Sequence, residues 1–419
     1  MRRLAIVYPR ANLDTVPSLV GAAEMLAEGG YEVDVFCYSS AAHPPPTFAS
    51  PRVRVRSLGV EDVADRATAG LRSAARRADW LPRSARTRLA QGYATLGASL
   101  AHGSRLMARV RTRRLARAGA YACLIGVDPD GLLLAQAMAG GAPVGYYSLE
   151  LLLSSELTGE ADARLKEQER RASREAAFVI VQDHERARLL AEDNGLAWER
   201  MVLVPNSPTG PARRLPSRAW PRRLGVAQDR RIVLHAGSLG DWTGIEALVA
   251  SAPNWPEPWV LVVHTRYDAQ SSAYVQRLRA SADPTRVFFS LRPVDRQTYQ
   301  DLVDGADVGL AFYVASGGSA FTGRNIQAIG LSSGKLAYYL RAGLPVVVNR
   351  AASIGAALEE AGCGLAVLDA AAIGPALSRI SADYARFSEA ACRFFDQNLE
   401  FRRAFSAAID RIDSLAAHA

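Results

Sequence analysis

Short apolar runs alternate along the chain with longer segments that are apolar on one side only. Apolar runs at Leu4–Tyr8 and Glu32–Cys37 have the length and composition of buried parallel strands. Between them, apolar positions from about Thr15 to Glu28 recur with helical spacing and end at two glycines. This alternation predicts a parallel, doubly wound α/β sheet.

The same alternation continues to about residue 204 and restarts near residue 232. In the first half, further strands are expected at Val53–Leu58, Ala122–Gly126, Val144–Tyr147, Phe178–Gln182 and Met201–Val204, with helices at Gly131–Met138, Ala161–Ala176 and Glu185–Asn194. In the second half, strands are expected at Ile232–Ala236, Trp259–His264, Val287–Leu291 and Val308–Phe312, with helices at Gly244–Ser251, Gln270–Ser281 and Arg296–Asp304. A chain of 419 residues also exceeds one compact core, so two successive doubly wound domains are predicted.

Prolines mark the boundary between the two halves. Pro205-Asn206-Ser207-Pro208 ends the first pattern, and more prolines follow among arginines up to Gly225. We therefore expect an N-terminal domain at residues 1–208, a linker at 209–228 and a second domain at 229–396. A last helical pattern, from Leu399 to Leu415, lies in residues 397–419.

The most informative segment is SSGKLAYYLRAGLPVVV, residues 332–348. Two serines and a glycine precede a short helix, so free backbone N–H groups and the positive end of the helix dipole face the space above Gly334. Lys335 adds a full positive charge, a glycine ends the helix, and a proline begins the next buried strand. This order predicts a phosphate site formed by Ser333, Gly334 and Lys335.

The segment resembles the nucleotide-sugar site of GT-B fold glycosyltransferases, in the large retaining group (glycosyl transferases group 1, family 4-like) with the motif P-N-K-L-x-E-Y-M-A-x-G-x-P-V-V. The matching positions are Lys335, Leu336, Tyr339, Gly343, Pro345, Val346 and Val347. The resemblance implies two Rossmann-like domains facing a cleft, with the acceptor on the first and the donor on the second. It also implies that residues 397–419 pack back on the first domain.

The resemblance further implies an activity. The expected reaction transfers a sugar, with retention, from a nucleotide-diphosphate sugar to a sugar, lipid-linked or small-molecule acceptor in glycan, glycolipid or glycosylated-metabolite biosynthesis. A dinucleotide-dependent oxidoreductase is disfavoured, because neither half has G-x-G-x-x-G in its first strand-to-helix turn.

Two glutamates of the family motif are replaced in this chain. The glutamate that holds the ribose falls on Tyr338, and an earlier one falls on Gly330. Tyr338 is therefore predicted to stack on the nucleoside or hydrogen-bond it. The missing carboxylates leave open a catalytically degenerate GT-B-like protein that acts as a binding partner or scaffold.

Two further loops follow strands of the second predicted domain. Gly237 and Ser238 lie in LHAGSLG, where a glycine lets the backbone approach a bound group closely, and this loop resembles the family loop that faces the diphosphate. Arg324, in the glycine-rich segment 315–325, is predicted to be a second phosphate-binding cation. The alternative for the Gly237 loop is an ordinary tight turn, and the alternative for segment 315–325 is a flexible surface loop.

Glu150 is the predicted catalytic residue on the acceptor side. It follows a strand in YYSLEL, which resembles the family segment Y-D-x-H-E-L. A carboxylate there can accept a proton from a hydroxyl or bind sugar hydroxyls. It can equally begin a helix and bind backbone N–H groups.

Metal binding has one candidate motif. Asp128-Pro129-Asp130 matches the D-x-D of metal-dependent glycosyltransferases, but these residues end a strand and precede a helix, so helix capping is the prediction. No metal or other cofactor is expected. His235 and His264 close two strands and either line the cleft or are structural.

The net charge of +8 is regional. Sixteen arginines and four acidic residues lie between Arg52 and Arg117, and apolar residues alternate with arginines over 72–117. This stretch predicts an amphipathic surface that contacts anionic membrane, with a solvated helix face as the alternative. No nucleic-acid-binding module is recognisable, so no nucleic-acid partner is expected.

The four cysteines lie far apart and without C-x-x-C spacing, which favours a reducing compartment over a disulfide framework or zinc site. The first nine residues have only a strand-length apolar run before Pro9, unlike a signal peptide, and the most apolar longer segment, 131–153, is interrupted by Pro143 and Glu150. A cytoplasmic protein is expected, at the inner face of the membrane if the arginine-rich stretch binds there.

Overall fold

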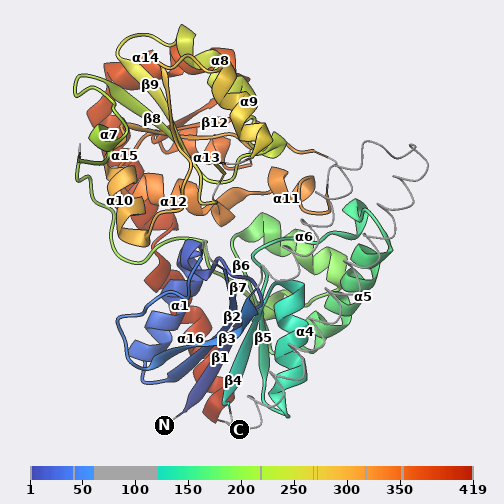
Figure 1. Ribbon diagram of the computed structural model, residues 1–419. Helices are drawn as coiled ribbons and strands as arrows, with labels where there is room; N and C mark the ends of the chain where they lie inside the picture. Colours follow the sequence, from blue (N-terminus) through green and yellow to red (C-terminus); the bar gives the residue numbers. More distant parts are fainter. Residues whose placement is uncertain are drawn as a thin grey trace, which may run out of the picture.

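Two parallel β-sheets form two lobes in the computed structural model of the protein (Figure 1). The structure describes residues 2–40, 43–60, 121–217, 219–267, 269–270, 272–316, 319–350 and 353–417. The predicted fold class, two doubly wound α/β units, is confirmed.

The lower lobe of Figure 1 contains a seven-stranded sheet in the order β3-β2-β1-β4-β5-β6-β7. Its strands are β1 Arg3–Tyr8, β2 Glu32–Ser39, β3 Val53–Val60, β4 Cys123–Val127, β5 Val144–Tyr147, β6 Phe178–Val181 and β7 Met201–Leu203. Its helices are the 3-10 turn η1 Leu13–Thr15, α1 Pro17–Glu28, α4 Asp128–Ala139, η2 Ser154–Glu156, α5 Glu160–Glu175, α6 His184–Asn194 and η3 Trp198–Arg200. Most strand residues are buried, as continuous apolar runs predict for a sheet covered on both faces.

The upper lobe contains a six-stranded sheet in the order β10-β9-β8-β11-β12-β13. Its strands are β8 Arg231–Ala236, β9 Trp259–His264, β10 Val287–Ser290, β11 Val308–Ala311, β12 Val346–Asn349 and β13 Gly364–Val367. The helices and turns after β7 are α7 Ala219–Arg223, η4 Asp241–Thr243, α8 Ile245–Ser251, η5 Ala252–Asn254, α9 Ala273–Ser281, α10 Arg296–Asp304, α11 Arg324–Gln327, η6 Gly330–Ser332, α12 Gly334–Arg341, α13 Gly355–Glu360, η7 Ala370–Ala372, α14 Ile373–Ala382, α15 Tyr384–Asn398 and α16 Phe401–Ala417. The predicted linker therefore includes a short helix, α7.

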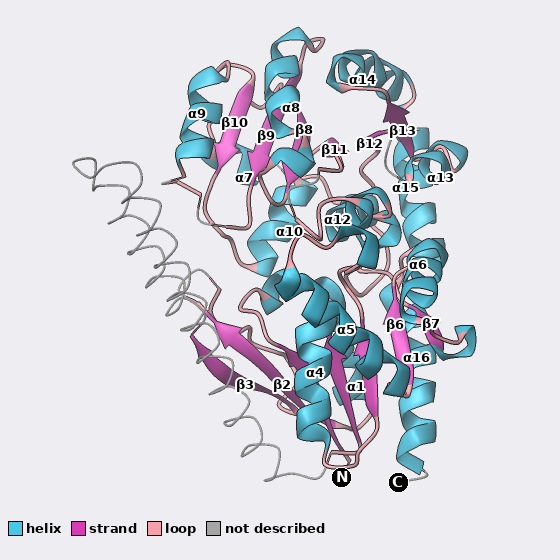
Figure 2. Ribbon diagram, turned by 90° about the vertical axis from the view of Figure 1, so that its right-hand side faces the viewer, coloured by secondary structure: helices cyan, strands magenta, loops and turns pink. Residues whose placement is uncertain are grey.

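The last helix, α16, belongs to the core of the lower lobe. Figures 1 and 2 both show it running beside the lower sheet. Its residues Phe401 and Phe405 are fully buried, together with apolar residues of α1 and β1. A side chain at Gly21 in α1 would meet the Phe401 ring at 2.9 Å, so this glycine lets the two helices approach. Burial of each phenylalanine contributes on the order of 2–3 kcal/mol.

The two lobes are joined by a buried arginine. Arg186 of α6 is fully buried, and its guanidinium donates to Leu149 O at 2.8 Å in the lower lobe. It also donates to Ala328 O at 3.1 Å and to Asn325 Oδ1 at 3.1 Å in the segment that includes α11. Several carbonyl-type acceptors thus compensate the loss of hydration of one guanidinium. Removing this side chain would leave these acceptors buried without their donor, so Arg186 stabilises the contact between the lobes.

The arginine-rich stretch 72–117 lies outside the described residues, so its predicted helices and membrane contact stay predictions. Within the described ranges, no helix is long and apolar enough to cross a membrane.

Candidate functional site

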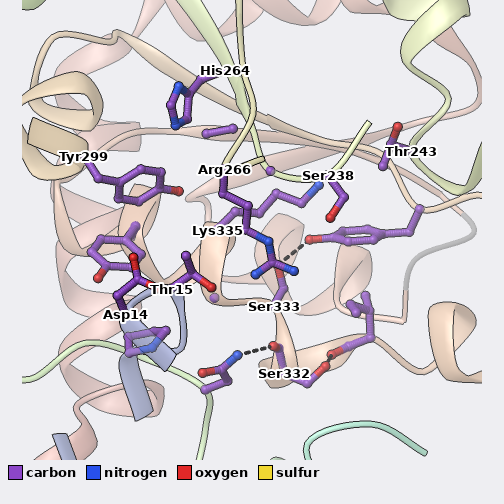
Figure 3. Close-up of a pocket in the computed structure, with 18 of the residues that line it drawn as sticks. Asp14, Thr15, Ser238, Thr243, His264, Arg266, Tyr299, Ser332, Ser333 and Lys335 are labelled. Atoms are coloured by element: carbon purple, nitrogen blue, oxygen red, sulfur yellow. Dashed lines mark hydrogen bonds between the residues drawn. The ribbon is translucent and has the colours of Figure 1, made fainter. Parts of the chain in front are cut away.

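A cavity of 240 Å³ lies between the lobes, at the carboxyl ends of β8, β9 and β11 (Figure 3). In doubly wound sheets, loops at this edge leave a crevice where ligands bind. The cavity is lined by Asp14, Thr15, Pro17, His43, Glu150, Asn206, Ala236, Gly237, Ser238, Trp242, Thr243, His264, Arg266, Val294, Arg296, Tyr299, Tyr313, Ile326, Ile329, Ser332, Ser333, Gly334, Lys335 and Tyr338. The predicted donor-site residues Gly237, Ser238, Ser333, Gly334, Lys335 and Tyr338 are all in this set.

The start of α12 is built as the sequence predicts. Ser333 is the N-cap of this helix, and its Oγ accepts a hydrogen bond from Leu336 N at 3.3 Å. The Ser333 hydroxyl also bonds the hydroxyl of Tyr313, from the loop after β11. The loop after β11 therefore holds the N-cap in place, and the helix presents its positive end to the cavity.

Lys335 extends into this cavity between Arg266 and Ser238 (Figure 3). Its Nζ lies 4.8 Å from the centre of the Tyr313 ring. Burial and then the nearby positive charge of Arg266 lower the Lys335 pKa to about 7. In the described part of the chain, no carboxylate forms a salt bridge with Lys335. An anion bound here would supply the missing counter-charge.

The turn after β8 borders the same ammonium group. Gly237 has φ +155, and a Cβ built on it would lie 3.9 Å from Lys335 Nζ. Its N–H is bonded to His264 O at 3.0 Å, which fixes the turn against the end of β9. The backbone therefore passes close to the cation, as the glycine-rich sequence predicts.

Arg324 lies elsewhere. This residue begins α11, is exposed, and is not among the residues that line the cavity. Its backbone N–H donates to the Glu156 carboxylate across the lobes. The structure instead brings Arg266 and Arg296 to the cavity. Arg266 follows β9 in a segment without glycines or a motif, so no local sequence signal marks it.

Tyr338 occupies the position of the family's ribose glutamate. It is buried and packs edge-on against Tyr299 of α10, with ring centres 4.9 Å apart. Both rings line the cavity, so aromatic surface stands where the family has a carboxylate.

Gly330 is incompatible with the family's other glutamate. Its φ is +40, and a Cβ there would lie 2.0 Å from Asp183 Oδ2. That carboxylate accepts a hydrogen bond from Leu331 N at 3.0 Å and so joins α6 to the upper lobe. An interlobe contact has taken the space that a side chain would need.

We expect Gly330→Ala to lower the free energy of unfolding by about 2 kcal/mol, because it combines an unfavourable positive φ with displacement of Asp183. Gly362→Ala is the matched control, since Gly362 has φ +69 and open space around it. Urea unfolding should show the larger loss at Gly330. Equal losses at the two positions would mean that Asp183 contributes nothing to the contact between lobes.

A second cavity, of 490 Å³, adjoins the first on the lower lobe. The two share Thr15, His43, Glu150, Asn206, Arg266, Ile329 and Ser332. Glu150, the predicted acceptor-side residue, lies in a loop and begins no helix. Its Oε2 accepts a hydrogen bond from Asn325 Nδ2 at 2.7 Å, so the upper lobe orients this carboxylate at the junction.

The prediction that Asp128 caps its helix is wrong. Val127 is the N-cap of α4, and Asp128 is the first helical residue, with φ +56. Its Oδ1 accepts hydrogen bonds from the N–H groups of Leu149 and Glu150, both at 2.9 Å. Its Oδ2 forms a salt bridge with Arg10 Nη2 at 3.3 Å. Burial raises the Asp128 pKa to about 6. The carboxylate thus holds the loop that carries Glu150.

Among the residues that the structure describes, no group of three or more His, Cys, Asp or Glu side chains is placed to hold a metal ion. His235 is fully buried within β8, and His264 lines the cavity with its Nδ1 bonded to Ser290 at 3.0 Å.

Comparison with known proteins identifies the fold. No protein-family profile matches the sequence, and no curated protein matches it. Sucrose-phosphate synthase from Thermosynechococcus elongatus is similar in structure, with a TM-score of 0.69, 16% identity and full coverage of both chains. HepE from Anabaena, solved with UDP and glucose, has a TM-score of 0.64 and 15% identity, covering 99% of this chain and 100% of its own.

Trehalose 6-phosphate synthase from Burkholderia multivorans has a TM-score of 0.61 and 15% identity, with full coverage of both chains. At these identities the likeness establishes the fold alone. The protein has the GT-B fold, as the resemblance of residues 335–348 implied.

Proposed function

We propose that the protein transfers a sugar from a nucleotide-diphosphate sugar to an acceptor bound on the lower lobe. The observation that carries this proposal is the half-buried Lys335 beside Arg266 at the N-terminus of α12, which has no carboxylate partner among the described residues and lies in a cavity between two GT-B lobes. Two cations and a helix N-terminus form a site for a diphosphate. UDP and glucose bound in HepE support a UDP-sugar as the first donor to test.

The same groups explain how departure of the nucleotide is assisted. When the bond between the anomeric carbon and the phosphate oxygen breaks, negative charge develops on the diphosphate. Lys335, Arg266 and the N–H groups at Gly334 are already in place to stabilise that charge, with little reorganisation. The site therefore binds the leaving group more strongly as the reaction proceeds.

The acceptor occupies the second cavity in this proposal. Glu150 lies where the two cavities meet, and its carboxylate is oriented by Asn325. It binds an acceptor hydroxyl or accepts its proton. The retention that the family resemblance implies stays a prediction, and the anomeric configuration of the product tests it. A sugar, lipid-linked or small-molecule acceptor fits the proposal, and contact of residues 72–117 with anionic membrane would favour a lipid-linked one.

We expect one nucleotide to stabilise the protein selectively in thermal-shift measurements with UDP, GDP, TDP and their common sugar conjugates. A ligand present at 100 times its Kd adds about 2.7 kcal/mol to the stability of the folded state. Absence of a shift with every nucleotide would contradict the proposal.

Turnover separates the proposal from the degenerate alternative. Release of nucleotide from the stabilising nucleotide sugar, followed over time, would establish an enzyme. Binding without release, with water and with added sugar acceptors, would indicate a GT-B-like binding protein.

A further inference from the structure

His43 and Asp14 meet where the two cavities join. Asp14 lies in η1, after β1, and His43 lies in the loop after β2. Since β1 and β2 pair in parallel, their carboxyl ends lie side by side and bring the two residues together. Both residues line the first cavity, and His43 also lines the second. Neither residue belongs to a recognisable sequence motif.

The His43 ring is fixed in one orientation. Its Nδ1 lies 3.1 Å from Asp14 Oδ1, and the ring packs edge-on against Tyr267 with centres 6.2 Å apart. Its backbone N–H donates to Ser40 Oγ at 3.0 Å, and Ser40 N–H donates back to His43 O at 3.0 Å. The side chain is only 7% exposed. Such a held, buried histidine is preorganised for a ligand.

The other ring nitrogen, Nε2, is buried and has no hydrogen-bond partner among the residues that the structure describes. An ionised carboxylate only accepts hydrogen bonds, so Nδ1 carries the proton that faces Asp14. In the neutral ring, Nε2 is then an acceptor. A buried acceptor without a donor is unfavourable by about 1–3 kcal/mol, so a binding partner at Nε2 stabilises the site.

We infer that His43 Nε2 accepts a hydrogen bond from a sugar hydroxyl at the junction of the two cavities, and that Asp14 holds the ring in the tautomer that does so. A hydroxyl carries the hydrogen that this nitrogen needs, whereas an ionised phosphate oxygen does not. The inference rests on the proposed function. The hydroxyl belongs either to the sugar of the donor or to the acceptor, since His43 borders both cavities.

The test compares His43→Ala with the wild-type protein in two measurements. The first is the ratio of the Kd of UDP to the Kd of UDP-glucose, by calorimetry. The second is the rate of UDP release from UDP-glucose in water, where water is the acceptor. If the thermal-shift panel selects another nucleotide and its sugar conjugate, that pair replaces UDP and UDP-glucose. His184→Ala is the matched control, because His184 is exposed and outside both cavities.

A donor hydroxyl at His43 predicts that the Kd ratio falls about tenfold, because only the sugar conjugate loses a contact. An acceptor hydroxyl predicts an unchanged ratio and a rate of UDP release lowered about tenfold or more. Both results support the inference and distinguish its two sources. Unchanged values in both measurements would overturn it. A wild-type protein that binds no nucleotide sugar would instead overturn the proposed function.

Asp14→Asn provides a variant of nearly unchanged shape. An amide facing Nδ1 can donate, which favours the ring tautomer that carries its proton on Nε2. That nitrogen then no longer accepts a hydrogen bond. We therefore expect the measurement that changes in His43→Ala to change in Asp14→Asn as well, with the affinity for UDP unchanged. A wild-type result for Asp14→Asn, with the fold intact by circular dichroism, would contradict the role of Asp14.

Discussion

Replacing Lys335 by methionine is expected to weaken binding of a nucleoside diphosphate about 100-fold, which corresponds to ~2.7 kcal/mol. The half-buried Lys335 lines the cavity at the start of α12, and losing one partner of a desolvated charge pair costs roughly 2–5 kcal/mol. Methionine keeps most of the unbranched side chain and removes the ammonium, together with its contact with the Tyr313 ring. Isothermal calorimetry with the nucleotide selected in the thermal-shift panel measures the change.

The fold of Lys335→Met should be unharmed. The Lys335 pKa is lowered in the empty site, so the charged form destabilises the folded protein below pH 7, and methionine removes that penalty. Arg324→Met is the matched control for loss of a cation, because Arg324 lies outside the cavity, and it should bind nucleotide normally. Unchanged affinity in Lys335→Met, or in the harsher Lys335→Glu, would refute the phosphate site.

The affinity for the same nucleotide is expected to fall about 100-fold between pH 7 and pH 9. Lys335 has a pKa of about 7 in the empty protein, and two bound phosphates raise it again. Below pH 7, Lys335 is already charged in the free protein, so its titration does not change the affinity for the nucleotide. Above pH 7 the free protein is neutral at Lys335 and takes up a proton when the anion binds, so affinity falls about tenfold per pH unit.

Calorimetry at pH 8–9, in two buffers of different ionisation enthalpy, should show uptake of about one proton per nucleotide. Lys335→Met should show neither the uptake nor the pH dependence. A wild-type affinity that stays constant from pH 7 to pH 9 would mean that Lys335 keeps its charge in the empty cavity.

The regular elements and the helix start at Ser333 were predictable because their signals are local. Strand β9 and helix α10 have the predicted bounds, since a continuous apolar run and a period of 3.6 residues are visible in a short window. Ser333, Gly334 and Lys335 are adjacent, so a helix start and a cation define their site together. The replacement of a family glutamate at Gly330 was also visible, but Asp183, which fills the space beside it, is not adjacent in sequence.

The other half of the site was not predictable, because it is assembled by topology. Asp14 and His43 follow neighbouring strands of the lower sheet, Arg266 follows β9 of the upper sheet, and only the fold brings the three residues to one cavity. Arg324 has the right chemistry for phosphate binding, yet it lies on the exposed side of α11. The position of Asp128 was predicted but its role was not, because its partners at Leu149 and Glu150 belong to the next strand's loop.

The packing of α16 into the lower lobe has a consequence for synthesis on the ribosome. Phe401 and Phe405 complete the core that also contains residues of β1 and α1, which are translated long before α16. The upper lobe has its own core from residues 220–399 and can collapse as soon as those residues emerge. The lower lobe must wait, with part of its apolar surface exposed, until residues 401–417 have left the exit tunnel. The domain that is made first is therefore finished last.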